Sequence, residues 1–179
     1  MAASKSKTLK LTYAAVCLAL CLVLPFLIGQ IPQIGQALSP MHIPVLLCGF
    51  LCGWPYGLVV GFIAPLLRSV LFGMPAMMPG AVSMAFELAT YGCLTGLLYK
   101  LFPKKIPYIY VTLIIAMICG RVVWGLARYI ISGLQSTSFP FSAFIAGAVT
   151  NAIPGIILHI VLVPIIVMAL RKARLVPNE

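Results

Sequence analysis

The sequence predicts an all-α integral membrane protein with six transmembrane helices and both termini in the cytoplasm. Of its 179 residues, 63% are hydrophobic and only 8% are charged, whereas soluble domains carry about a quarter charged residues. Its apolar runs are much longer than the ~10-residue alternating strands of a membrane barrel. Its lysines cluster in short segments outside those runs, which is typical of a multi-pass helical protein.

Turn signals rich in glycine and proline divide the chain into apolar segments. A bilayer core of ~30 Å needs about 20 helical residues. We expect a single six-helix transmembrane domain over residues 1–179, with spans at about 11–29, 41–53, 55–73, 80–101, 107–133 and 140–170. The span 41–53 has the weakest support because it has few apolar residues. The connection 28–40, IGQIPQIGQALSP, continues neither a helix nor a regular strand.

The charge distribution favours six spans over five or seven. With six, the basic segments KSKTLK, KLFPKK and RKAR all lie on one side, and the opposite connections 28–40, 73–80 and 133–140 carry no charged residue. Lys and Arg mark the cytoplasmic side, so we expect both termini to be cytoplasmic. These flanks explain most of the net charge of +10 without any nucleic-acid partner.

Ionisable residues inside membrane spans are costly and suggest a functional site. Counted from the expected outer ends, Arg68, Glu87 and Arg128 fall in the outer half of the membrane. Arg121 and Asn151 lie nearer the midplane. The sequence therefore predicts a polar cluster that opens to the outside, and His42 lies at its mouth.

One face of the fifth expected helix presents two cations and an aromatic ring. Arg121, Trp124 and Arg128 are spaced i, i+3 and i+7, which places them on one side of a helix. Glu87 can neutralise only one of the intramembrane arginines. At least one positive charge therefore remains for a ligand or for backbone carbonyls.

A purely structural interpretation of the same residues stays open. Arg68 and Glu87 can form a buried ion pair that fixes the hairpin between their helices, while Arg128 reaches the outer headgroups. Asn151 can join two helices by a hydrogen bond. His159 is expected to be a packing residue.

The sequence gives no support for an enzyme or a cofactor. It contains no Asp, no HExxH, no GxSxG and no pair of carboxylates that could share acid–base work or bind a metal. It has no P-loop, so an ATP-driven step needs a partner. The six cysteines lie in apolar runs, and we expect them to be small buried hydrophobes: Cys17, Cys21, Cys48, Cys52, Cys93 and Cys119.

The first helix offers a surface for another helix. Ala15 and Ala19 are four residues apart and Ala14 lies beside them. Small side chains at this spacing let two helix backbones approach closely. Packing inside the protein is the alternative explanation.

The chain resembles, nearly end to end, the substrate-binding (S) components of energy-coupling factor (ECF) transporters. The strings MHIPVLLCGF and FELATYG and the distance between them are the most specific part of the resemblance. The stretches that carry it are AAVCLALCLVLPF, SPMHIPVLLCGFLCGWPYGLVVGFIAPLLRS, FGMPAMMPGAVSMAFELATYGCLTGLLY, CGRVVWGLARYI and GAVTNAIPGIILHIVLVPIIV.

This resemblance implies a six-helix protein of the bacterial plasma membrane that captures a vitamin or related micronutrient from outside. Such proteins associate with a transmembrane coupling subunit and two ABC ATPases, and release the ligand inside by toppling in the lipid bilayer. An alanine motif in the first helix contacts the coupling subunit. Here Ala15 and Ala19 match that motif, and Ala14 is their neighbour.

Our functional hypothesis is a binding subunit that does no chemistry itself. Glu87, Arg128 and Asn151 would hold the ligand, and Trp124 or Tyr91 would stack on a ring. The remaining residues expected in the site are Gln33, Gln36, His42, Arg68 and Arg121.

The substrate class stays open at this point, and so do two rival functions. An excess of arginine favours a carboxylate such as pantothenate or a folate-like molecule, whereas a free Glu87 favours an amino-bearing heterocycle such as a queuosine precursor or a pyrimidine. The rivals are a membrane scaffold without a ligand and a stand-alone secondary transporter.

Overall fold

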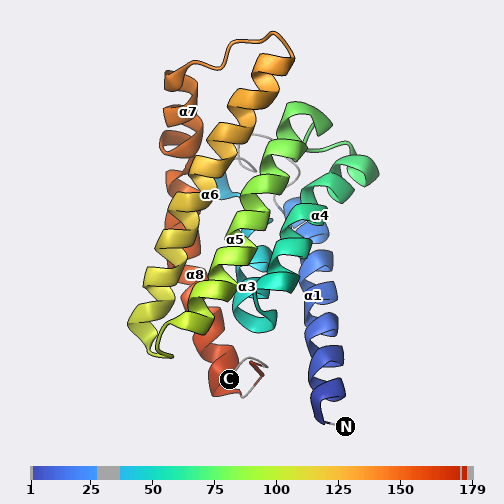
Figure 1. The fold of residues 1–179 in the computed structure, drawn as a ribbon, viewed down its shortest axis with the longest axis vertical. Helices are drawn as coiled ribbons and strands as arrows, with labels where there is room; N and C mark the ends of the chain where they lie inside the picture. The colour runs from blue at the N-terminus through green and yellow to red at the C-terminus, as the bar shows by residue number, and fades with distance from the viewer. Residues whose placement is uncertain (1, 28–36, 174, 177–179) are drawn as a thin grey trace.

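The computed structural model describes residues 2–27, 37–173 and 175–176, and these residues form helices without any strand (Figure 1). The predicted all-α class is confirmed. The elements are α1 (Ala2–Leu27), α3 (His42–Cys52), α4 (Trp54–Phe72), the π-helical turn η1 (Met77–Ala81), α5 (Val82–Leu101), α6 (Ile106–Leu134), α7 (Phe141–Ala148), the 3-10 turn η2 (Thr150–Ala152) and α8 (Ile153–Lys172).

Five stretches of the described chain are long and apolar enough to cross a membrane. They coincide with five of the six predicted spans to within a few residues. Helix α1 itself begins at Ala2, which is earlier than the predicted start of the first span at residue 11. These stretches are Lys7–Leu27, Trp54–Phe72, Met77–Leu101, Ile106–Leu134 and Phe141–Lys172.

The sixth predicted span, 41–53, is a half-length helix at the centre of the molecule. Helix α3 has 11 residues, about 16 Å at 1.5 Å per residue, which is roughly half of the hydrocarbon core. All of its residues are buried, because its sequence HIPVLLCGFLC is uncharged and apolar on every side. The short segment expected at 41–53 is therefore found as a short central helix over His42–Cys52.

The last predicted span, 140–170, is broken into two helices. Helix α7 ends at Ala148, and Val149 has φ −121° and ψ −70°, outside the helical region. Pro154 in the first turn of α8 has no backbone N–H to continue the ladder of hydrogen bonds. The break places Asn151 in the turn η2.

Helices α4 and α5 pack backbone against backbone. A Cβ added to Gly92 would lie 2.1 Å from the carbonyl oxygen of Gly57. A Cβ added to Gly61 would lie 2.3 Å from the carbonyl oxygen of Leu88. Only glycine permits this approach, so these two helices form a rigid pair.

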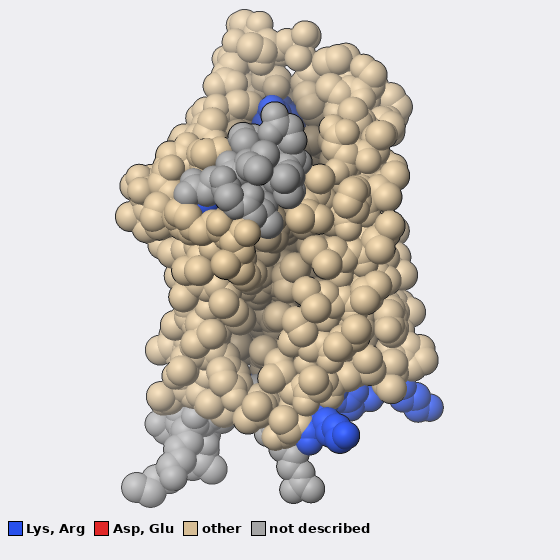
Figure 2. All heavy atoms as spheres, turned by 180° about the vertical axis from the view of Figure 1, so that it is seen from behind, with Lys and Arg blue, Asp and Glu red and all other residues tan. Residues whose placement is uncertain are grey.

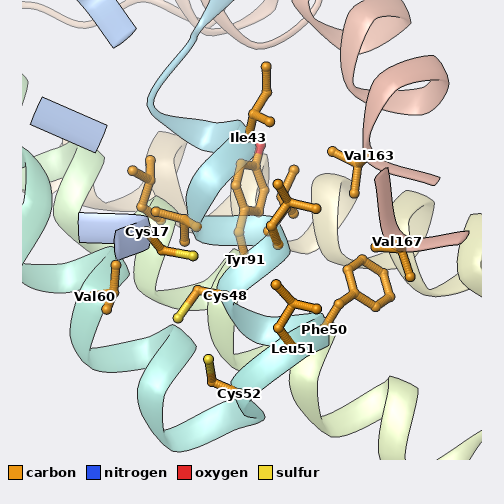
Figure 3. Close-up of a cluster of buried hydrophobic side chains, with 14 of the residues drawn as sticks. Cys17, Ile43, Cys48, Phe50, Leu51, Cys52, Val60, Tyr91, Val163 and Val167 are labelled. Atoms are coloured by element: carbon orange, nitrogen blue, oxygen red, sulfur yellow. The ribbon is translucent and has the colours of Figure 1, made fainter. Parts of the chain in front are cut away.

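The core surrounds α3 (Figure 3). The side chains of Cys17, Cys48 and Cys52 extend into the same part of it, and the ring of Phe50 packs edge-on against Tyr99 with centroids 5.1 Å apart. All six cysteines are free. Four of them are buried as expected, and the remaining two, Cys93 and Cys119, are partly exposed.

The basic segments gather at one end of the molecule. Figure 1 shows both chain termini and the 102–105 connection at this end, with the α4–η1 and α6–α7 connections at the other. In Figure 2, Lys and Arg atoms gather near the termini, while the described surface between the two ends is largely uncharged. The shared position of the three basic segments agrees with the charge argument for an even number of crossings.

Candidate substrate pocket

A cavity of about 680 Å³ lies toward the end of the molecule opposite the termini. Its volume is within the range of ~300–1,000 Å³ typical of small-molecule sites. The cavity is bounded by the start of α3, the η1 region, α6 and α7. Because α3 spans only about half of the membrane depth, its first residues form the floor of this space.

Glu87 of α5 is the charge centre of the cavity and is only 1% exposed. Its Oε1 atom lies 3.0 Å from Nη1 of Arg121 and 3.4 Å from Nε2 of His42. The hydroxyl of Tyr91 donates a hydrogen bond of 3.0 Å to the same oxygen. Tyr91 follows Glu87 by one helical turn, so both side chains lie on one face of α5.

The His42 ring lies between Glu87 and a second histidine. Its plane stacks on His159 with centroids 5.7 Å apart and an interplanar angle of 16°. The Nε2 atom of His159 lies 3.3 Å from the carbonyl oxygen of Ser39, which agrees with the packing role expected for His159. Among the residues that the structure describes, neither buried ring nitrogen of His42 has a hydrogen-bond partner, although the residue lines the cavity.

Arg68 does not pair with Glu87, so the ion pair considered in the structural interpretation is wrong. Its guanidinium, on α4, donates a hydrogen bond to the carbonyl oxygen of Leu22 on α1. It also lies over the rings of Phe26 and Phe72, at 4.9 and 5.3 Å from their centroids. Arg68 therefore lines the cavity, and its partners among the described residues are all uncharged.

The predicted face of α6 is confirmed, because Arg121, Trp124 and Arg128 all line the cavity. The Trp124 ring stacks on Phe144 at 6.4 Å and meets Phe139 edge-on at 6.0 Å. These contacts hold its orientation at the cavity wall.

The two α6 arginines differ in their partners. Arg121 is paired with Glu87, yet its Nε atom is buried and finds no hydrogen-bond partner in the described ranges. Arg128 is partly buried and has no ion pair or hydrogen bond among the residues that the structure describes. On this face of α6, the charge of Arg121 is therefore neutralised by Glu87, whereas the charge of Arg128 is not neutralised by any described residue.

The remaining wall is mainly apolar. Asn151 adds one side-chain amide from η2, and Ser39 lies near the floor. The apolar residues come from α1, η1 and its flanks, α5 and the α7 region: Pro25, Met74, Pro75, Ala76, Pro79, Met84, Phe139, Ala143 and Ala146.

The structure brings most of the predicted site residues together. Those at the cavity wall are His42, Arg68, Glu87, Arg121, Trp124, Arg128 and Asn151. Tyr91 does not line the cavity and is 1% exposed behind Glu87, so it is not placed to stack on a ligand. Gln33 and Gln36 lie outside the described residues. Phe139 also lines the cavity but was not predicted. It is a single aromatic residue in a connecting segment, and no sequence pattern marks such a residue as part of a cavity wall.

The predicted partner surface on α1 is reduced to two alanines. Ala15 and Ala19 are exposed on the outside of the helix. Ala14 is 5% exposed and belongs to the hydrophobic core. Ala14 therefore faces the inside of the protein and is removed from this surface.

The side chains that line the cavity are suited to binding a small molecule. Within the described ranges, no group of three or more His, Cys, Asp or Glu side chains is arranged to hold a metal ion. The cavity instead offers guanidinium donors, an amide, one carboxylate and an indole ring on an apolar wall. This combination fits recognition of a small organic molecule.

Comparison with known proteins supports this assignment. Residues 9–167 match a family model described as "ECF transporter, substrate-specific component". No curated protein and no solved structure matches the chain.

Proposed function

The chain belongs to the substrate-specific components of ECF transporters, and we propose that its cavity captures a vitamin or related micronutrient outside the cell. The observation that carries this proposal is the position of the polar cluster. A single cavity wall holds Glu87, Arg121, Arg128 and Asn151, at the end away from the basic termini.

We place the cavity on the outer side of a bacterial plasma membrane. The segments KSKTLK, KLFPKK and RKAR mark the cytoplasmic side by their positive charge. The opposite end would then face the medium from which a nutrient is taken. In this orientation the ligand enters between the η1 region and α7 without crossing the protein.

Each polar residue has a distinct role in this proposal. Arg128 and Asn151 contact the ligand directly, and Trp124 covers a ring or an apolar part. Glu87 fixes Arg121 and His42 at the floor of the cavity. A bound ligand excludes water, which strengthens the charged contacts because the effective dielectric constant falls.

Delivery to the cytoplasm requires partners in this proposal. The ligand is released after the chain docks on a transmembrane coupling subunit that is driven by two ABC ATPases. Ala15 and Ala19 are exposed on α1 and are the docking residues that we propose. The substrate classes are those that the sequence left open, pantothenate or folate-like acids and queuosine-precursor-like heterocycles.

The proposed binding function is tested by the thermal stability of the detergent-purified chain with a panel of vitamins and nucleobase precursors. A ligand at about 100 times its dissociation constant adds about 2.7 kcal/mol to the free energy of unfolding, so the melting temperature rises. We expect Glu87→Gln to lose this ligand-induced rise. Lys172→Gln, at the opposite end, is the control and should keep it.

A second measurement distinguishes the rival functions. We expect uptake into proteoliposomes only when the coupling subunit, the ATPases and ATP are present. Ion-driven uptake by the chain alone would instead indicate a secondary transporter. A chain that no panel compound stabilises, with wild type and Glu87→Gln responding alike, would indicate a scaffold.

A further inference from the structure

We propose that the ligand is an organic anion, whose acidic group is held by Arg68 and Arg128 and whose uncharged part packs on the apolar wall. This inference rests on the proposed binding function. It selects one of the substrate classes that the sequence left open.

The first step is the charge of the cavity. Three guanidinium groups line it, from Arg68, Arg121 and Arg128, against the single carboxylate of Glu87. Neutralisation of Arg121 by Glu87 leaves two positive charges. A cationic ligand would add a third in a site shielded from water, where like charges repel strongly. An anion with one or two negative charges removes the excess.

The second step is that one carboxylate oxygen of Glu87 already has partners within the protein. Its Oε1 atom accepts a hydrogen bond of 3.0 Å from the hydroxyl of Tyr91 and forms an ion pair of 3.0 Å with Arg121. The same atom lies 3.4 Å from Nε2 of His42. An amino-bearing ligand that bound this oxygen would have to displace these groups. In this proposal Glu87 is a positioning residue for Arg121 and His42, and its Oε1 atom is not the main ligand contact.

The third step is that two cations have no acidic partner among the residues that the structure describes. There, the polar and aromatic contacts of Arg68 are with a carbonyl oxygen and two phenyl rings, and Arg128 forms no ion pair or hydrogen bond. They reach the cavity from α4 and α6. A guanidinium offers two parallel N–H donors that fit a carboxylate or a phosphate group.

The fourth step is a pair of buried nitrogen atoms at the floor that have no hydrogen-bond partner among the described residues. They are Nδ1 of His42, a residue only 2% exposed, and Nε of Arg121, which is a donor. Unpaired buried polar atoms are costly, and both residues line the cavity. A ligand oxygen that reached Nε of Arg121 would satisfy this donor, whereas the apolar wall around Met84 and Trp124 suits the uncharged part of the ligand.

The test determines the charge of the ligand before its identity. The small-molecule filtrate of yeast extract is separated at pH 7 on anion and cation exchangers into acidic, basic and neutral fractions. Each fraction is added to the purified full chain, and the melting temperature is measured. We expect the acidic fraction alone to raise it. Treatment of that fraction with phosphatase then distinguishes a phosphate ester, which loses its effect, from a carboxylate, which keeps it.

Four variants complete the experiment, with Arg68→Gln measured beside Arg128→Gln. Arg128→Gln should need about tenfold more of the acidic fraction for the same rise, because it loses a charged hydrogen-bond donor. Arg128→Lys keeps the charge but loses the paired donors, so its loss should be smaller. Lys172→Gln removes an equal charge at the opposite end and should respond like wild type.

The outcomes separate this inference from the proposed function. Stabilisation by the basic or neutral fraction, without an effect of the acidic one, would overturn the anion assignment and leave the binding function standing. An acidic fraction that stabilises Arg128→Gln and Arg68→Gln as well as wild type would also overturn it. If no fraction raised the melting temperature, the binding function itself would fail.

Discussion

Nη1 of Arg121 lies 3.0 Å from Oε1 of Glu87 and joins α6 to α5 at the floor of the cavity. Both side chains come from helices that cross the apolar part of the molecule, and Glu87 is almost fully buried. Such a pair is costly to desolvate but far more costly to break, since one charge is then left alone. The pair therefore couples the stability of the fold to the geometry of the site.

Removing one member of this pair should be strongly destabilising. We expect Arg121→Gln to lower the free energy of unfolding by about 3–5 kcal/mol, because a buried carboxylate loses its counter-charge. The double variant Arg121→Gln/Glu87→Gln should lose less than the sum of the single losses, by about 0.5–3 kcal/mol. Denaturant unfolding in detergent measures this cycle, and additive losses would contradict the coupling.

Replacing a glycine between α4 and α5 should separate the two helices. A Cβ on Gly92 would lie 2.1 Å from the backbone oxygen of Gly57, and neither backbone can yield without moving a helix. We expect Gly92→Ala to cost at least about 1–3 kcal/mol. Gly133→Ala, also on a helix but with no atom within 4 Å of the added Cβ, is the control. Equal melting temperatures for the two variants would refute the close packing.

The hydroxyl of Tyr91 should stabilise the protein through Glu87. Tyr91→Phe removes the hydrogen bond to Oε1 and keeps the ring that packs against Gly120. Hydrogen bonds to charged groups contribute about 1.5–3 kcal/mol, so we expect a loss of that size in the free energy of unfolding. Tyr129→Phe removes a hydroxyl from an exposed side chain and should cost little. A Tyr91→Phe protein as stable as this control would show that the bond contributes nothing.

The outer face of α1 should matter for uptake but not for binding. Ala15→Leu and Ala19→Leu enlarge exposed side chains and would hold a partner helix away from the backbone. We expect ligand-induced stabilisation to be unchanged and ATP-driven uptake with the coupling subunit to fall at least about tenfold, since one lost close contact of ~1.4 kcal/mol is a factor of ten. Val122→Phe adds bulk to an exposed residue of α6 and is the control. Normal uptake by both alanine variants would place the docking surface elsewhere.

The helical arrangement could be predicted from the sequence because it depends on local features. Apolar runs separated by GWPYG, GMPAMMPG and PKKIP gave most helix positions to within a few residues. The break at Val149 was missed, since Pro154 alone does not distinguish a kink from the start of a new helix. The short helix α3 was expected at 41–53 and is found at His42–Cys52, because the turn signals on both sides limit its length.

The site could be predicted only in part, for a related reason. Counting depth along each helix correctly grouped Arg68, Glu87, Arg121 and Arg128 near one cavity. The choice of partner for Glu87 depends on how α6 is rotated against α5, which no pattern within one helix specifies. Tyr91 could have been found as its hydrogen-bond donor, because it lies one turn further along the same face.

Helix α3 closes the cavity from below. All of its eleven residues are buried, and His42 at its start is part of the cavity wall. The cavity is therefore bounded by α3 on the side that faces the chain termini. In the orientation that we propose, α3 separates a ligand in the cavity from the cytoplasm. Release toward the cytoplasm then requires either a displacement of α3 or a rotation of the whole molecule in the membrane.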